Sequence, residues 1–127
     1  MQENQLFEYA VIRVVPRVER EEFINVGVIL FCAKQKFLNC QFGFDKKRLV
    51  AFSDKIDLEE IKNSLCAFEQ ICLGSEMAGP IGKLSIASRF RWLTATRSTI
   101  VQTSKVHPGL CTDPQQTLER LHEQLVI

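Results

Sequence analysis

The first third of the chain alternates between runs of β-forming residues and short polar breaks, and this pattern predicts three strands. Residues 6–16 are rich in Val, Ile, Phe and Tyr and end at a proline, which is typical of a strand that stops there. Residues 23–32 are apolar at nearly every position, as expected of a central strand buried on both faces. A third run, residues 37–44, follows after a short break, so we expect an antiparallel hairpin between the second and third strands.

Two polar side chains interrupt the apolar faces of these strands. Arg13 stands among apolar neighbours in the first strand, and Asn25 stands just before Gly27 in the second. Strict alternation would place Asn25 on one face with Ile29 and Phe31. Glycine within a strand usually marks a bulge or the close approach of another group. We therefore expect a polar, bulged place in the sheet, where Arg13 and Asn25 either brace the backbone or frame a small binding site.

Helical periodicity begins after the third strand. Asp45 precedes a short stretch that reaches Phe52, and this pattern predicts a short helix. A longer helix is predicted to begin after Asp57 and to end at Gly74, because capping residues of these types favour those positions. Its apolar residues step by three and four along the chain: Leu58, Ile61, Leu65, Phe68 and Cys72. They form one apolar face, which we expect to pack on the sheet.

The second half of the chain carries weaker signals. Residues 74–82 contain several glycines and a proline, so we expect an exposed loop. Residues 84–93 fit both periodicities, with the helical one preferred, and residues 99–104 predict a short strand. The His-Pro-Gly sequence at 107–109 predicts a turn, and the Asp-Pro pair at 113–114 predicts the start of a final helix.

These elements together predict an α+β fold in a single domain spanning residues 1–127. The expected architecture is a mainly antiparallel sheet, begun by the first three strands, joined by the strand near Ile100 and covered by two main helices. Of the 127 residues, 46% are hydrophobic and 24% are charged, which excludes disordered and coiled-coil chains. A domain of this size can bury a core without disulfides or a metal.

The start of the chain and its cysteines predict the compartment. The first residues are polar and lack the basic and apolar regions of a secretion signal. The longest apolar run, residues 26–33, is far too short for a membrane helix, so no membrane partner is expected. The five cysteines are odd in number and include no Cys-x-x-Cys pair, which indicates reduced and largely buried thiols. We therefore expect a cytoplasmic protein.

Charge is unevenly distributed, although the formal net charge is only +1. Residues 77–112 contain five cations and no Asp or Glu, whereas the rest of the chain carries 11 positive and 15 negative side chains. This basic segment mixes cations, aromatic rings and hydroxyl groups, as in sites that hold phosphates or stack bases. Its candidate binding residues are Arg89, Arg91, Trp92, Arg97 and Lys105. Three interpretations stay open: ion pairs that brace the acidic remainder, a surface for an acidic protein partner, and a site for nucleic acid or a phosphorylated ligand.

The sequence contains no complete catalytic, metal or cofactor motif. Residues 79–83 are similar to a phosphate-binding loop but lack its first glycine and the Ser or Thr after the lysine. His107, Cys111 and Asp113 bring together a base, a thiol and a carboxylate, without the spacing of a metal site or a nucleophile pair. His107 is a candidate binding residue near the surface, and His122 is expected on the solvated side of the final helix. We therefore predict no catalytic residue, no metal ligand and no cofactor.

Four sequence blocks, in this order, carry a resemblance to a known family. They are residues 9–16 (YAVIRVVP), 22–31 (EFINVGVILF), 89–93 (RFRWL) and 107–110 (HPGL). From Tyr9 to its last helix, the chain resembles the bacterial domain-of-unknown-function family number 3037. The resemblance implies a small bacterial cytosolic protein with no assigned reaction and no identified catalytic residue. It also implies an association with HipA-like kinases, because relatives tend to be encoded beside genes for such kinases.

These observations favour a non-enzymatic interaction protein, and the partner we expect is a HipA-like kinase, of which the chain would be an accessory or an antagonist. The first alternative is a module that binds nucleic acid or phosphate through residues 83–105. The second alternative is an enzyme of an unrecognised kind, with a site near Arg13, Asn25 and His107. An interaction protein predicts an exposed apolar patch, whereas an enzyme predicts a hollow in which the polar residues converge.

Overall fold

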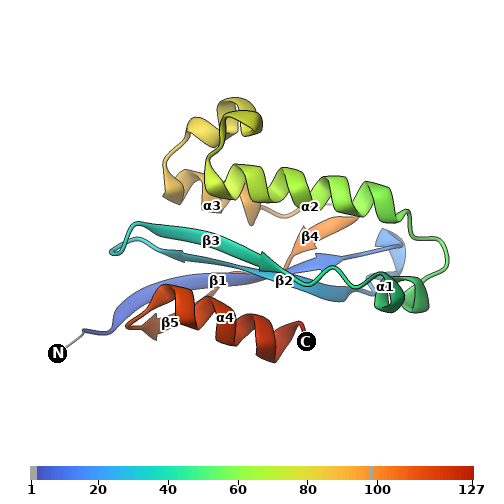
Figure 1. Cartoon of the computed structure of the whole chain (residues 1–127), viewed down its shortest axis with the longest axis horizontal. Coiled ribbons are helices and arrows are strands. Elements are labelled where there is room, and N and C mark those ends of the chain that lie inside the picture. The colour runs from blue at the N-terminus through green and yellow to red at the C-terminus, as the bar shows by residue number, and fades with distance from the viewer. Residues whose placement is uncertain (1–2, 98) are drawn as a thin grey trace.

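One antiparallel sheet with helices on both of its faces makes up the structure (Figure 1), a computed structural model that describes residues 3–97 and 99–127. The strands are β1 (Gln5–Val14), β2 (Ile24–Cys32), β3 (Phe37–Phe42), β4 (Val101–Thr103) and β5 (His107–Cys111). The α-helices are α1 (Lys46–Phe52), α2 (Leu58–Leu73), α3 (Ile86–Leu93) and α4 (Pro114–Leu125), and the 3-10 helices are η1 (Val18–Arg20) and η2 (Glu76–Lys83). The predicted α+β fold is confirmed.

The longest strand, β1, has neighbours along both of its edges. β2 pairs with one edge of β1, and β3 pairs with the far edge of β2. Along its other edge β1 pairs with two short strands in succession, first β5 beside residues 5–9 and then β4 beside residues 12–14. The predicted hairpin between β2 and β3 and the central, buried position of β2 are both confirmed.

Helices cover the sheet on each face (Figure 1). On one face α2 and α3 pack over a core that includes Ile12, Ile29 and Phe90. Within it the ring of Phe90 stacks on that of Phe31, with 5.2 Å between the ring centres. On the opposite face α4 packs through a second core that includes Leu118. The prediction that two main helices cover the sheet is therefore confirmed, with α2 and α4 on opposite faces.

The predicted helix ends are present in the structure. The Asp57 carboxylate accepts hydrogen bonds from the backbone N–H groups of Glu59 and Glu60 at the start of α2. The same helix ends at Gly74, whose φ of +68° favours glycine. Asp113 caps the start of α4 in the same way. Even α2, with 16 residues, is too short to cross a bilayer, and no helix in the described ranges has the length and apolarity to do so.

The prediction of a turn at residues 107–109 is wrong, because these residues begin β5 and pair with β1. Pro108 is tolerated there because β5 is an edge strand, in which a missing N–H does not break the sheet. Gly109 lies against the ring of Phe7, and a Cβ at this position would lie 2.5 Å from that ring. Glycine is thus required for the close approach of two strands and not for a turn.

The segment that connects α2 to α3 is more regular than predicted. Residues 74–82 were expected to form an exposed loop, but most of them belong to η2. Gly79, with a φ of +69°, kinks this 3-10 helix. Gly82 is buried, and a Cβ there would lie 2.6 Å from the Cβ of Ala78. The glycines therefore allow a tight, kinked and partly buried 3-10 helix after α2.

Candidate functional site

A β-bulge lies where the polar residues interrupt β1 and β2. Arg13 pairs with Asn25, whereas the residue before Arg13 pairs with Gly27, so Val26 is an extra residue in β2. The side-chain amide of Asn25 donates a hydrogen bond of 3.0 Å to the backbone carbonyl of Leu125, at the end of α4. The predicted bulge beside Gly27, braced by a contact from Asn25 to the backbone, is confirmed.

The bulge changes which residues of β2 share a face. Asn25 contacts α4, whereas Ile29 and Phe31 belong to the core under α2 and α3. The predicted grouping of Asn25 with Ile29 and Phe31 is therefore wrong, because the extra residue shifts the alternation by one position. Gly27 is required for close contact with β3, since a Cβ there would lie 2.7 Å from the carbonyl oxygen of Gln41.

Arg13 stacks on an aromatic ring and has no ion pair with any of the residues that the structure describes. The central carbon of its guanidinium lies 3.8 Å from the centre of the Phe23 ring. Its Nε is buried without a hydrogen-bond partner, and burial lowers the pKa of the guanidinium below its ordinary value. Stacking occupies the flat face of the group and Nε is buried, so the N–H donors of the two Nη atoms are the ones that stay available to another molecule.

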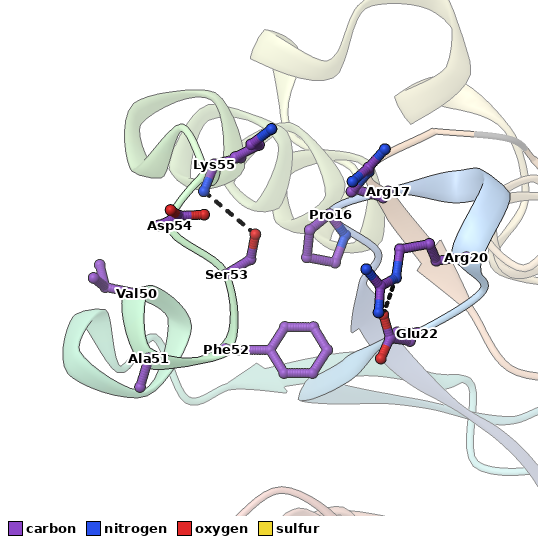
Figure 2. Close-up of a pocket in the computed structure, with 10 residues that line it drawn as sticks. All are labelled: Pro16, Arg17, Arg20, Glu22, Val50, Ala51, Phe52, Ser53, Asp54 and Lys55. Atoms are coloured by element: carbon purple, nitrogen blue, oxygen red, sulfur yellow. Dashed lines mark hydrogen bonds and ion pairs between the residues drawn. The ribbon is translucent and has the colours of Figure 1, made fainter.

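Three adjoining hollows surround the end of the sheet near η1 and α1. The Arg17 hollow, of about 420 Å³, lies between the η1 region and the connection from α1 to α2 (Figure 2). The Asn25 hollow, of about 450 Å³, is lined by Phe23 and Phe52 as well as Asn25. The Arg13 hollow, of about 400 Å³, lies beside β4. Phe52 borders the first two hollows and Phe23 borders the last two, so the three form one continuous, uneven surface.

An aromatic ring and two arginines, each of which forms an ion pair, line the Arg17 hollow. Figure 2 shows the Phe52 ring projecting across it toward Glu22. The guanidinium of Arg17 pairs with Glu19 at 2.9 Å, and that of Arg20 pairs with Glu22 at 2.5 Å. These two arginines are therefore matched by carboxylates from the same loop, and the side chains of Phe52 and Val50 are large apolar features that stay open to solvent.

Four large apolar side chains around these hollows are exposed. Their exposed fractions are 39% for Val18, 42% for Phe23, 52% for Val50 and 39% for Phe52. We call this set the Phe23–Phe52 surface. Sequence reasoning missed it, because the pattern identifies Phe23 as the start of a strand and Phe52 as the end of a helix. The available signal is a large apolar residue at the end of an element, beside charged residues.

The arginines of the basic segment contact the chain itself. Arg89 donates a hydrogen bond of 2.8 Å to a backbone carbonyl between η2 and α3. Arg91 pairs with Glu8 of β1 at 2.6 Å. Arg97 donates to the backbone carbonyl of Leu93, at the end of α3, at 3.2 Å. The pair of Arg91 agrees with the interpretation in which ion pairs brace the acidic remainder, but Arg89 and Arg97 contact backbone carbonyls and form no ion pair with a described residue. The two binding interpretations stay predictions.

The other two candidates of the basic segment are exposed. Trp92 is 45% exposed, and the guanidinium of Arg97 lies 5.1 Å from the centre of its indole ring. Lys105 is exposed in the connection between β4 and β5. The candidate residues are thus distributed over α3, the segment after it and the connection between β4 and β5.

His107 lies well away from Arg13 and Asn25. It is exposed in β5, where it pairs with Tyr9, and the two ring centres are 5.3 Å apart. Arg13 lies four residues further along β1, which corresponds to roughly 13 Å at the usual rise of a strand. The structure brings Arg13 and Asn25 into neighbouring hollows, and His107 lines neither of them.

This geometry locates a candidate surface without a reaction, and comparison with known proteins adds a family. The pattern of the family described as "Protein of unknown function (DUF3037)" matches residues 9–126, nearly the whole chain. The chain belongs to the DUF3037 family. No curated protein and no solved structure matches it. The resemblance predicted from the four sequence blocks is therefore confirmed.

His122 of this DUF3037 chain is buried, so the prediction that it lies on a solvated face is wrong. Only 5% of the residue is exposed, and its ring packs against Gly43, just after β3. Burial lowers the pKa of His122, and a hydrogen bond with the backbone of Gln41 opposes this effect more weakly. Its Nδ1 is buried without a hydrogen-bond partner. His122 is therefore a core residue that disfavours protonation.

The cysteines of the DUF3037 chain are free thiols, and four of the five are buried. Cys66 is the exposed one. A hydrogen bond with Cys72, together with burial, raises the pKa of the Cys40 thiol. The prediction of free and largely buried thiols is confirmed. Within residues 3–97 and 99–127, no group of three or more His, Cys, Asp or Glu side chains is arranged to hold a metal ion.

Proposed function

We propose that this DUF3037 protein is a non-enzymatic interaction protein of the bacterial cytoplasm and an accessory or antagonist partner of a HipA-like kinase. The observation that carries the proposal is the Phe23–Phe52 surface. The kinase is proposed as the partner because the family resemblance associates relatives with such kinases. The surface supports binding to a protein, and the resemblance supports the choice of that protein.

The placement of the exposed side chains favours a protein partner. Full burial of a Val or Phe side chain contributes about 1.5–3 kcal/mol, and the four residues of this surface, each 39–52% exposed, forgo part of this contribution in the isolated chain. They gather around three adjoining hollows, and aromatic anchors beside pockets are typical of the energetic centre of an interface. A partner side chain in the Asn25 hollow would contact Phe23 and Phe52 together.

Charged residues beside this surface are suited to the rim of an interface. Arg17 and Arg20 form exposed ion pairs with glutamates of the same loop. Exposed pairs of this kind contribute little to folding, so a partner can replace them at small cost. Mixed charge around an apolar centre gives specificity and faster association more than it gives affinity. The surface therefore suits a partner with an apolar centre and its own mixed-charge border.

The two alternatives have less support. A nucleic-acid module would need the cations of the basic segment on one surface, but Arg91 is paired with Glu8 and the candidates are distributed over α3, the segment after it and the connection between β4 and β5. An enzyme would need its polar candidates in one hollow, but His107 is distant from Arg13. Lys105 and Trp92 are exposed, so the experiment that tests the proposal also measures binding of nucleic acid.

Affinity capture from the native host tests the proposed partner. The tagged full chain should recover a HipA-like kinase of the host, and nuclease treatment should leave that recovery unchanged. Replacing Phe23 and Phe52 together by Ser should abolish the recovery. Capture of nucleic acid without the kinase would contradict the proposal and favour the basic-segment alternative.

A further inference from the structure

We propose that the Arg13 hollow binds a small organic anion, in which a phosphate or carboxylate group is carried on an apolar body. The hollow lies where β1, β4 and the segment around η1 meet, and its volume is about 400 Å³. This volume suits a ligand of the size of a substituted benzene ring. The proposed site adjoins the Phe23–Phe52 surface but needs no partner protein, so it goes beyond the interaction proposed above.

Arg13 provides the first anchor for an anion. It has no ion pair with a described residue, and its Nε is buried without a hydrogen-bond partner. A partly buried cation without a counter-ion opposes folding, and a bound anion would remove this penalty. Phe23 holds the guanidinium by its flat face at 3.8 Å, and the two Nη groups, which donate to no described residue, stay free for a bidentate contact with an oxyanion.

A second cation lines the same hollow and is held in place by backbone groups. Arg97 donates hydrogen bonds to the carbonyls of Trp92 and Leu93, which orient its side chain. Because carbonyls are neutral, these bonds leave the positive charge of Arg97 uncompensated. Gln102 pairs with Arg13 across the β1–β4 ladder and adds a polar side chain to the lining. Two guanidinium groups and an amide thus border one small space.

The remaining lining residues define what the ligand carries besides its charge. Glu21 is the one carboxylate among the lining residues, so two arginines and this glutamate leave a net charge of +1 around the hollow. A single bound anion would balance that charge. The apolar lining consists of Val15, Val18 and Phe23. An anionic group at the arginines would therefore place an apolar body against these side chains.

Titration of the purified full chain with three probes tests the site. Phenyl phosphate and benzoate, added at constant ionic strength, should bind and raise the Tm of the chain. Inorganic phosphate should bind about tenfold more weakly than phenyl phosphate, because it lacks the apolar body. The ratio of the affinities for phenyl phosphate and benzoate measures which anionic group the site prefers.

Variants of Arg13 identify the hollow as the place of binding. Arg13→Gln should weaken phenyl phosphate binding about 10- to 100-fold, because it removes a charge-assisted bidentate contact. Arg13→Lys should give an intermediate affinity, and Glu21→Gln should strengthen binding. Arg120→Gln is the matched control, because Arg120 is exposed on α4 outside this hollow. This variant should bind phenyl phosphate with the affinity of the wild type.

Two results would overturn the proposal. One is the absence of binding of phenyl phosphate and benzoate to the wild-type chain, and the other is equal binding by Arg13→Gln and Arg120→Gln. If Arg13→Gln does not fold, Arg13→Lys decides: reduced affinity supports the site, and unchanged affinity overturns it. Since no measurement uses the kinase, a negative result here leaves the proposed interaction intact.

Discussion

Asn25 joins the bulge in β2 to the end of α4 by one side-chain hydrogen bond, 3.0 Å from its Nδ2 to the Leu125 carbonyl. Replacing Asn25 by Ala removes the donor and leaves the part-buried Leu125 carbonyl without this hydrogen bond. We expect Asn25→Ala to lower the free energy of unfolding by about 1–3 kcal/mol. Urea unfolding followed by circular dichroism measures the change.

Asn63→Ala is the matched control for this substitution. Asn63 is exposed on α2, and its side chain forms no hydrogen bond with a described residue. Asn63→Ala should therefore change the free energy of unfolding by no more than about 0.5 kcal/mol. Equally small changes in the two variants would show that Asn25 does not brace the bulge.

Burial of His122 makes the stability of the chain depend on pH. Its pKa is lowered from an ordinary value of 6.5, mainly by desolvation, so the unfolded chain takes up this proton more readily than the folded chain. The contribution of His122 is therefore fully present above about pH 6.5 and is lost as the pH falls through the folded pKa. We expect the free energy of unfolding to decrease between about pH 7.5 and 5.5.

The other histidine of the chain provides the control for this pH dependence. His122→Gln should reduce the decrease in stability between the two pH values, although it lowers stability at both because it disturbs the core. His107→Gln should leave the decrease unchanged, because His107 is exposed in β5. Chemical unfolding of the three proteins at both pH values checks this. An equal decrease in the free energy of unfolding in all three proteins would contradict the assignment to His122.

A single residue predicts an irregular structure where its polarity conflicts with that of its neighbours in the element. Arg13 and Asn25 are polar residues in apolar strands, and this conflict correctly indicated an irregular place in the sheet. At His122 the residue type is misleading. This histidine lies four residues after Leu118 and so shares its helix face, but its polar character led to the expectation of solvent. The helical period was the better guide, because packing sets the buried face.

Elements with a strong period and a capping residue could be predicted from sequence, whereas β5 could not. The period and the capping Asp of α2 are both local signals. In contrast, β5 begins with His-Pro-Gly, which locally favours a turn, and it exists because β1 offers a free edge beside residues 5–9. Tertiary pairing therefore overrides local propensity at this strand.

The contact between Gly109 and Phe7 gives a test of β5. An Ala at position 109 would place its Cβ 2.5 Å from the Phe7 ring, so either the ring or the strand must move. We expect Gly109→Ala to lower the free energy of unfolding by about 1–3 kcal/mol and to increase hydrogen exchange at residues 107–111. Pro108→Ala, an exposed position of the same strand, should change both quantities much less.

Equal effects of Gly109→Ala and Pro108→Ala would contradict this pairing of β5 with β1. The measurement is specific to the element, because α4 follows directly after β5 and provides an internal reference. Exchange in the middle of α4 should stay close to that of the wild type if only the strand is displaced. A uniform increase across the sheet would instead indicate global destabilisation.

At the scale of the whole molecule, the fold class was predictable and the candidate surface was not. The α+β fold follows from three clear strands and two clear helices, each with its own period. The Phe23–Phe52 surface combines the residue before β2, the end of α1 and η1, which the fold brings together from separate parts of the chain. No local pattern reports that these ends adjoin.

The Phe23–Phe52 surface also makes the central claim measurable with purified proteins. If the proposed partnership holds, isothermal titration with a HipA-like kinase from the same host should give binding to the wild-type chain. The double variant Phe23→Ser with Phe52→Ser should bind at least about 100-fold more weakly, since two aromatic anchors of an interface are lost. The control double variant, Leu73→Ser with Leu110→Ser, removes two exposed apolar side chains elsewhere and should bind like the wild type. Absence of binding by the wild-type chain, or equal loss of affinity in both double variants, would contradict the account.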